Sequence, residues 1–212
     1  MIEPIKQKYE KSGSKVVEAL KKRHFDAYYV STKEKALKKA LEIIPENHSI
    51  GWGGSLSIDG IGLKEELKKA GHKMIDRDLA KTPEERNQIM LQALGSDTFM
   101  MSSNAITEDG QLFNIDSVAN RVAALCFGPK SVVIVAGMNK VVPNLEAAYH
   151  RVRGFASPAN AQRFQINTPC KLTGECGDCT GTDCICNQFV TTRLCKPAGR
   201  IKVILVGEDL GL

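Results

Sequence analysis

Residues 131–140 read SVVIVAGMNK, and this stretch decides the fold. Its first part, SVVIVAG, is a continuous apolar run, a pattern typical of a parallel strand covered on both faces. Asn139 and Lys140 follow at the carboxyl end of that strand, which is where ligands bind in open α/β sheets. The stretch therefore predicts a buried strand and makes Lys140 a candidate ligand-binding residue. The alternative for Lys140 is an ordinary surface lysine.

Helical and strand patterns alternate on both sides of this stretch. Apolar or glycine-bounded runs predict strands at 26–30, 48–55, 72–76, 98–102 and 201–208. Amphipathic patterns predict helices at 4–22, 61–71 and 143–163. Two further helices are predicted from their start signals, one after a capping box of Ser31 with Glu34 and one after Thr82-Pro83-Glu84-Glu85. Asp109-Gly110 predicts a tight hairpin. This alternation favours an α/β fold with a largely parallel sheet.

Length and composition predict one domain over residues 1–212, with 42% apolar residues. No apolar run is long enough to span a membrane, and the N-terminus lacks the apolar core of a signal peptide, so we expect a cytoplasmic protein. The formal charge is +5, but the lysines recur at helical spacing, which favours a solvated helix face over an acidic partner. An aromatic content of 6% without a basic stripe argues against nucleic-acid binding.

The glycine turn Gly53-Gly54-Ser55 is the first candidate site. A strand that runs through glycines into a helix can present backbone N–H groups to phosphate or carboxylate, with Ser55 and Ser57 as hydroxyl donors. The turn is not a Walker loop, since no Gly-Lys-Ser/Thr follows. The alternative is that glycine serves only the tight turn and close packing.

A second candidate site lies within residues 104–121. Carboxylates, amides and an arginine near strand ends can supply a general base and groups that orient a substrate. Glu108 and Asp109 are the candidate catalytic residues, although Asp109 also suits a turn and Glu108 an outward position on a hairpin. The candidate ligand-binding residues here are Asn104, Asn114, Asp116, Asn120 and Arg121.

Six of the seven cysteines lie between Cys170 and Cys195, in residues 168–196, which we interpret as an insertion before the last strand. Disulfides are rare in the cytoplasm, and the Cys176/Cys179 pair lacks the helical context of a redox site, so metal binding by four thiolates is favoured. Zinc and an iron–sulfur cluster both accept four thiolates. The isolated Cys126 is predicted to be a small core residue, and the four histidines to be structural or on the surface.

Three segments of the chain resemble the LUD (lactate utilisation) domain family: GGSLSIDGIGL, SDTFMMSSNAITEDGQLFN and SVVIVAGMNKVV. The cysteine segment is similar to that of a LUD subgroup with the pattern PC, TGxCxDC and ICN. The resemblance implies a NagB/RpiA/CoA-transferase-like fold, with a three-layer, largely parallel sheet flanked by helices and a C-terminal cysteine-rich metal-binding loop. It also implies Cys170, Cys176, Cys179 and Cys186 as the metal ligands, leaving Cys184 and Cys195 outside the set.

The function implied by this resemblance is a part in lactate or organic-acid utilisation. The chain would bind a small anionic metabolite and act with iron–sulfur oxidoreductase subunits that oxidise L-lactate. Gln111 stands where amino-sugar deaminases of the fold have a catalytic histidine, which argues against their chemistry. The alternatives are a stand-alone isomerase or acyl/CoA transferase using Glu108 or Asp109, and a regulatory ligand-binding module with a structural zinc. Monomer and homodimer both remain open.

Overall fold

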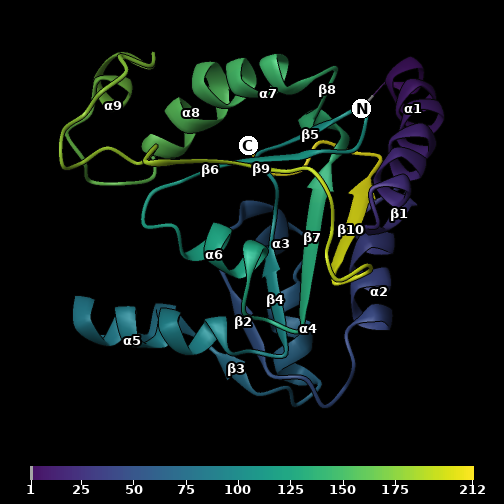
Figure 1. Ribbon diagram of the computed structural model, residues 1–212, viewed down its shortest axis with the longest axis horizontal. Coiled ribbons are helices and arrows are strands. Elements are labelled where there is room, and N and C mark those ends of the chain that lie inside the picture. Colours follow the sequence, from purple (N-terminus) through teal and green to yellow (C-terminus); the bar gives the residue numbers. More distant parts are fainter. Residues whose placement is uncertain (1) are drawn as a thin grey trace.

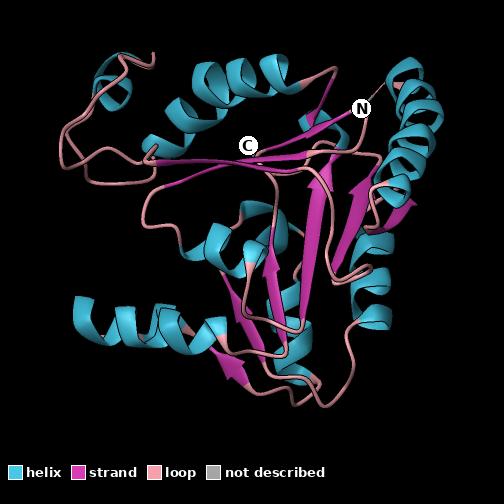
Figure 2. Ribbon diagram, viewed as in Figure 1, coloured by secondary structure: helices cyan, strands magenta, loops and turns pink. Residues whose placement is uncertain are grey.

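A six-stranded parallel sheet forms the centre of the computed structural model, which describes residues 2–212 (Figures 1 and 2). The strand order is β1-β10-β7-β4-β2-β3. The bounds are β1 Asp26–Val30, β2 Ile50–Trp52, β3 Met74–Ile75, β4 Thr98–Met101, β7 Ser131–Gly137 and β10 Ile201–Val206. The predicted strands are therefore confirmed, as is the parallel pairing, which holds along the whole sheet.

The strand β7 is buried on both faces because helices cover each side of the sheet. Val132, Ile134 and Ala136 pack into one apolar cluster, while Val133 and Val135 pack into another on the opposite face. This alternation explains why the strand is continuously apolar, since both of its faces lie in a core.

Two layers of helices enclose the sheet (Figure 2). One face is covered by α1 (Glu3–Lys22), α5 (Pro83–Leu94) and α6 (Asn120–Cys126). The other face is covered by α2 (Lys33–Ile43), α3 (Leu56–Gly60) and α4 (Leu63–Lys69). The three-layer α/β architecture is thus confirmed. Among the described residues, no helix is long and apolar enough to cross a membrane.

Helix starts follow the capping residues, with one correction. Thr82 caps α5 as predicted, because its hydroxyl accepts the backbone N–H of Glu85. The start of α2 was predicted one residue early, since Thr32 rather than Ser31 accepts the backbone N–H of Lys35. The hydroxyl of Ser31 is instead bonded to the side chain of Lys35.

A second, four-stranded sheet lies beyond the carboxyl ends of the main one, in the order β8-β5-β6-β9 (Figure 1). Its strands are β5 Ala105–Thr107, β6 Leu112–Asp116, β8 Val141–Val142 and β9 Gln188–Thr192. The predicted hairpin joins β5 to β6. Above it lie α7 (Leu145–Arg151), the π-helical turn η3 (Val152–Ala156) and α8 (Ser157–Ala161).

The cysteine-rich segment contributes to this second sheet. It contains the short helix α9 (Pro169–Thr173) and the edge strand β9, which pairs antiparallel with β6. Two short 3-10 turns complete the fold, η1 (Arg77–Leu79) after β3 and η2 (Met138–Lys140) after β7.

Candidate functional site

Lys140 is buried at the point where three neighbouring strands of the main sheet end. It closes η2 after β7, Ser102 follows β4, and Ser57 lies in α3 beyond the glycine turn that follows β2. Because β7, β4 and β2 are adjacent and parallel, their carboxyl ends meet at one edge. Lys140 Nζ donates hydrogen bonds to Ser57 Oγ and Ser102 Oγ, both at 3.0 Å. Only 4% of Lys140 is exposed, so its interpretation as a surface lysine is wrong.

The charge of Lys140 has no acidic partner among the described residues. Burial, together with the positive charges of Arg151 and Arg121, lowers the pKa of Lys140 from 10.5 to about 7. A buried cation without a counter-ion is costly, because burial removes the water that would stabilise its charge. The site therefore carries excess positive charge, which a bound anion would balance.

The wall beside the Lys140 amine is formed by the chain after β10. Ser57 Oγ donates to the carbonyl of Leu210 at 3.2 Å, and the amide of Asn139 bonds the backbone of Leu210 and Gly211. A methyl group at Gly211 would lie 2.6 Å from Ser57 Oγ and 3.3 Å from Lys140 Nζ. Glycine at this position thus keeps side-chain atoms out of the space beside the amine.

Arg151 connects Lys140 to the asparagines of the second sheet. Its guanidinium donates to the carbonyl of Asn139 at 3.1 Å and to that of Asn104 at 2.7 Å. Asn104 in turn receives the backbone N–H of Ile115 and donates its own N–H to Asn114 Oδ1. Asn114 is completely buried, and its Nδ2 has no hydrogen-bond partner within residues 2–212. An unpaired buried amide is costly, so it marks a place where a ligand oxygen would be stabilising.

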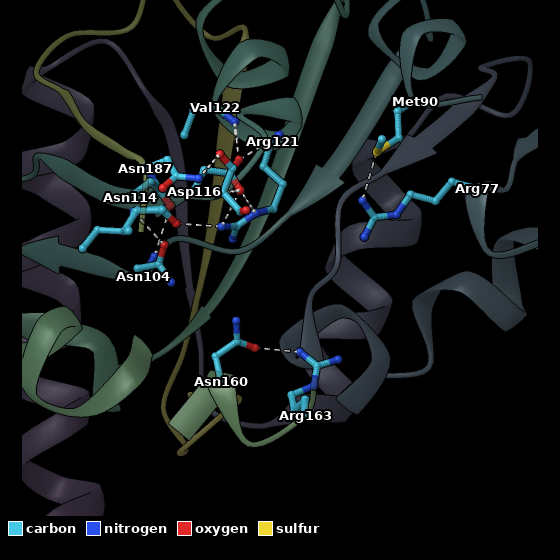
Figure 3. A network of polar contacts seen from close by, with 12 residues as sticks. Arg77, Met90, Asn104, Asn114, Asp116, Arg121, Val122, Asn160, Arg163 and Asn187 are labelled. Atoms are coloured by element: carbon cyan, nitrogen blue, oxygen red, sulfur yellow. Dashed lines mark hydrogen bonds and ion pairs between the residues drawn. The ribbon is translucent and has the colours of Figure 1, made fainter. Parts of the chain in front are cut away.

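Asp116 and Arg121 form a partly buried ion pair at the start of α6, shown in Figure 3. Asp116 accepts the backbone N–H groups of Arg121 and Val122, which begin the helix, and its carboxylate lies 3.1 Å from the guanidinium. The hydrogen bonds of the Asp116 carboxylate thus serve mainly to hold Arg121 in place. Asn120 begins the same helix and is partly exposed.

The glycine turn is shaped around two arginines. A methyl group at Gly53 would collide with the aliphatic part of Arg121, and one at Gly54 would lie 3.0 Å from the guanidinium of Arg77. The Nε of Arg77 is buried without a hydrogen-bond partner among the described residues, and one terminal nitrogen contacts Met90 (Figure 3). Ser55 caps α3 by accepting the backbone N–H of Ile58. Close packing therefore accounts for both glycines.

The two candidate catalytic carboxylates lie in the hairpin turn between β5 and β6. Asp109 is paired with Arg23 at 2.5 Å and bonded to Thr107 and Gln111, and these hydrogen bonds together with Arg23 hold its pKa below the usual value. Glu108 is exposed, and its backbone N–H is bonded to Val142. Asp109 thus serves the turn, where it faces an open groove beside α1.

Five thiols line one small cavity of about 20 Å³ between α8, α9 and the loop before β9. They include the four cysteines that the family pattern implied and also Cys184, which is buried. All seven cysteines are free thiols, so a disulfide framework is absent from residues 2–212. The five are Cys170, Cys176, Cys179, Cys184 and Cys186.

The donor chemistry of this cavity fits a soft metal ion or cluster, since thiolates select zinc and iron–sulfur centres. The thiols are not arranged as the ligands of a closed metal site, because no three His, Cys, Asp or Glu side chains in the described chain are positioned to hold an ion. Burial and contact with Cys184 raise the pKa of Cys179 to about 11. Arg153 borders the cavity and bonds Asp178 at 2.6 Å, which ties the Cys176–Cys179 loop to η3.

The remaining two cysteines lie elsewhere. Cys195 is only 1% exposed and packs in the main core, where its thiol contacts Pro197 and Ile201. Cys126 was predicted to be a core residue, and this is wrong, because it is exposed at the end of α6. The helix buries Val122, Ala124 and Leu125 instead.

A comparison with protein families shows to which family the chain belongs. The family profile described as the LUD domain matches residues 13–206, which is almost the whole sequence. The chain belongs to the LUD domain family. This family is associated with lactate utilisation. A comparison with curated proteins found no match.

One solved structure shows the same fold as this LUD domain. A DUF162 family protein from Deinococcus radiodurans aligns with a TM-score of 0.53 at 12% identity, covering 93% of this chain and 98% of that one. Ribose 5-phosphate isomerase A from Neisseria gonorrhoeae aligns with a TM-score of 0.34 at 21% identity, covering 53% of this chain and 54% of that one.

Three functional candidates of this LUD domain were missed in its sequence. Arg77 follows β3, so the rule that ligands bind at carboxyl strand ends could have included it. Ser102 follows β4 and could have been found in the same way. Arg151 had no such signal, because a basic residue on an amphipathic helix is ordinarily solvated.

Proposed function

We propose that this LUD domain binds a small organic anion of lactate or related metabolism at the carboxyl edge of its main sheet. The observation that supports this most strongly is Lys140, a buried cation whose described partners are only the hydroxyls of Ser57 and Ser102. Arg151 and Arg121 add positive charge close to it. A carboxylate bound there would receive charge-assisted hydrogen bonds and relieve the repulsion among the cations.

Thermal unfolding with added L-lactate, pyruvate or inorganic phosphate tests this proposal. A ligand that binds only the folded chain stabilises it, by about 2.7 kcal/mol when present at 100 times its dissociation constant. Lys140→Met should remove that stabilisation, whereas the matched control Lys68→Met, at an exposed position on α4, should retain it. An absence of stabilisation by all three anions would contradict the proposal.

We also propose that the cysteine cavity holds zinc or an iron–sulfur cluster. Cys170, Cys176, Cys179 and Cys186 would supply the four thiolates, with Cys184 as a neighbouring fifth thiol. A zinc ion would stabilise the segment, and a cluster would also transfer electrons. Anaerobic purification followed by iron, sulfide and zinc analysis tests this. A colourless protein without stoichiometric metal would refute it.

Substitution separates the metal ligands from the other cysteines. Cys170→Ser should lower both metal content and thermal stability, because metal binding contributes to folding free energy. Cys126→Ser is the matched control, since this exposed thiol lies outside the cavity and should leave both unchanged. Equal metal content in the two variants would contradict the assignment.

We further propose that the domain works with iron–sulfur oxidoreductase subunits that oxidise L-lactate. The family association with lactate utilisation supports this, as does the exposed ring of Phe189, which contacts Arg153 at the edge of the thiol cavity. A reconstituted L-lactate-oxidising complex should lose activity when this chain is omitted. Undiminished oxidation without it would rule out a role as a required component.

A further inference from the structure

The amine of Lys140 has surroundings that differ from those of an ordinary anion-binding lysine. It is buried, both of its described partners are hydroxyl groups, and Arg151 and Arg121 disfavour its positive form. The buried amine is therefore neutral in a large share of molecules near pH 7, and its neutral form has a lone pair that makes it a nucleophile, as in lysines activated by burial and neighbouring cations. The arginines retain their own charge, so the site attracts an anion whether or not Lys140 is protonated.

We propose that Lys140 forms an imine with a small 2-oxo acid, the chemical class to which the oxidised form of a 2-hydroxy acid belongs. The substrate carboxylate would be bound by the positive charge of Arg151 and Arg121, and its carbonyl carbon would meet the Lys140 amine. The inference rests on the anion site proposed above and adds a covalent step to it.

The step is a condensation that needs no oxidant or reductant. The Lys140 nitrogen attacks the carbonyl carbon, and the carbonyl oxygen takes up a proton to give a carbinolamine. The C–O bond then breaks, and the oxygen leaves as water with both protons that the amine has lost. The hydroxyls of Ser57 and Ser102, each 3.0 Å from Nζ, are placed to pass these protons between nitrogen and oxygen.

The chain after β10 lies next to the Lys140 amine and requires glycine at position 211. Ser57 donates a hydrogen bond to Leu210, and the next residue, Gly211, has a φ of 67°. Glycine adopts this backbone conformation far more readily than residues with a side chain. A side chain here would enter the space beside Lys140 Nζ.

Reductive trapping of the full-length protein tests the imine. Pyruvate and cyanoborohydride are added near neutral pH, and the digested protein is analysed by mass spectrometry. Lys140 should carry a carboxyethyl group, because the reagent reduces the imine but not the carboxylate. Lys140→Arg should lose this adduct, and Lys68→Arg should keep it. L-Lactate has the carboxylate but no ketone group to form an imine, so it should compete for the site and reduce trapping.

Each result separates the imine from the anion site. Stabilisation by pyruvate without an adduct at Lys140 would overturn the imine and leave the anion site standing. An adduct spread equally over exposed lysines, with Lys140 unmodified, would also overturn it. Neither stabilisation nor adduct would overturn both proposals, provided that circular dichroism shows the protein to be folded.

Discussion

The lowered pKa of Lys140 makes a quantitative prediction about stability and pH. The folded chain loses the Lys140 proton near pH 7, whereas an unfolded chain keeps it up to about 10.5. Burial of the charged form therefore penalises the folded state fully below pH 7, and the penalty disappears as the pH rises toward 10.5. Stability rises through this window because the unfolded state binds more protons.

The magnitude follows from the size of this window. Each pKa unit corresponds to about 1.36 kcal/mol, and the site is half titrated at pH 7, so raising the pH from 7 to 9 should relieve about 2 kcal/mol of the penalty. Lys140→Met lacks this titration. Its loss of hydrogen bonds to Ser57 and Ser102 changes stability by an amount that does not depend on pH.

Urea unfolding at pH 7, 8 and 9 measures the effect. The stability of the original protein relative to Lys140→Met should increase by about 2 kcal/mol between pH 7 and 9. Lys68→Met serves as the control for the pH dependence of the rest of the chain, because this lysine is exposed. Parallel profiles for the original protein and Lys140→Met would refute the account of a buried cation without a counter-ion.

Three further predictions concern other parts of the fold. Thr82→Ala should cost about 1 kcal/mol in urea unfolding by removing the cap of α5, with Thr82→Ser close to the original protein; equal losses in both would contradict a capping role. Gly53→Ala should cost about 1–3 kcal/mol and weaken anion binding, because the new methyl group displaces Arg121; unchanged binding would separate Arg121 from the site. In a timed thiol titration, Cys126→Ser should remove one fast-reacting thiol and Cys195→Ser should remove none, since the first is exposed and the second is buried; the reverse order would contradict the described burial.

Much of the candidate site could be anticipated from residues at strand ends. Lys140 was found because parallel strands expose their carboxyl ends at one edge, whereas close packing against arginines accounts for the glycines of the predicted anion-binding turn. The same reasoning points to Ser102 as a strand-end residue, but it does not say that β4 pairs with β7, so the contact of Ser102 with Lys140 is decided only by the tertiary structure. Nor could it foresee that arginine side chains pack against Gly53 and Gly54, where a Cβ atom would obstruct them.

The sequence by itself determined the α/β architecture, because the hydrophobic periodicity, the helix-capping residues and the glycine positions act over a few residues and recur along the whole chain. It also showed six cysteines close together in the chain, while the set of four metal-binding thiolates implied by the family resemblance stays a prediction. Only the tertiary structure decided that Lys140 is buried, that Cys184 joins the cavity and that Cys126 is exposed. The physical reason is that burial and charge environment depend on which distant segments pack together.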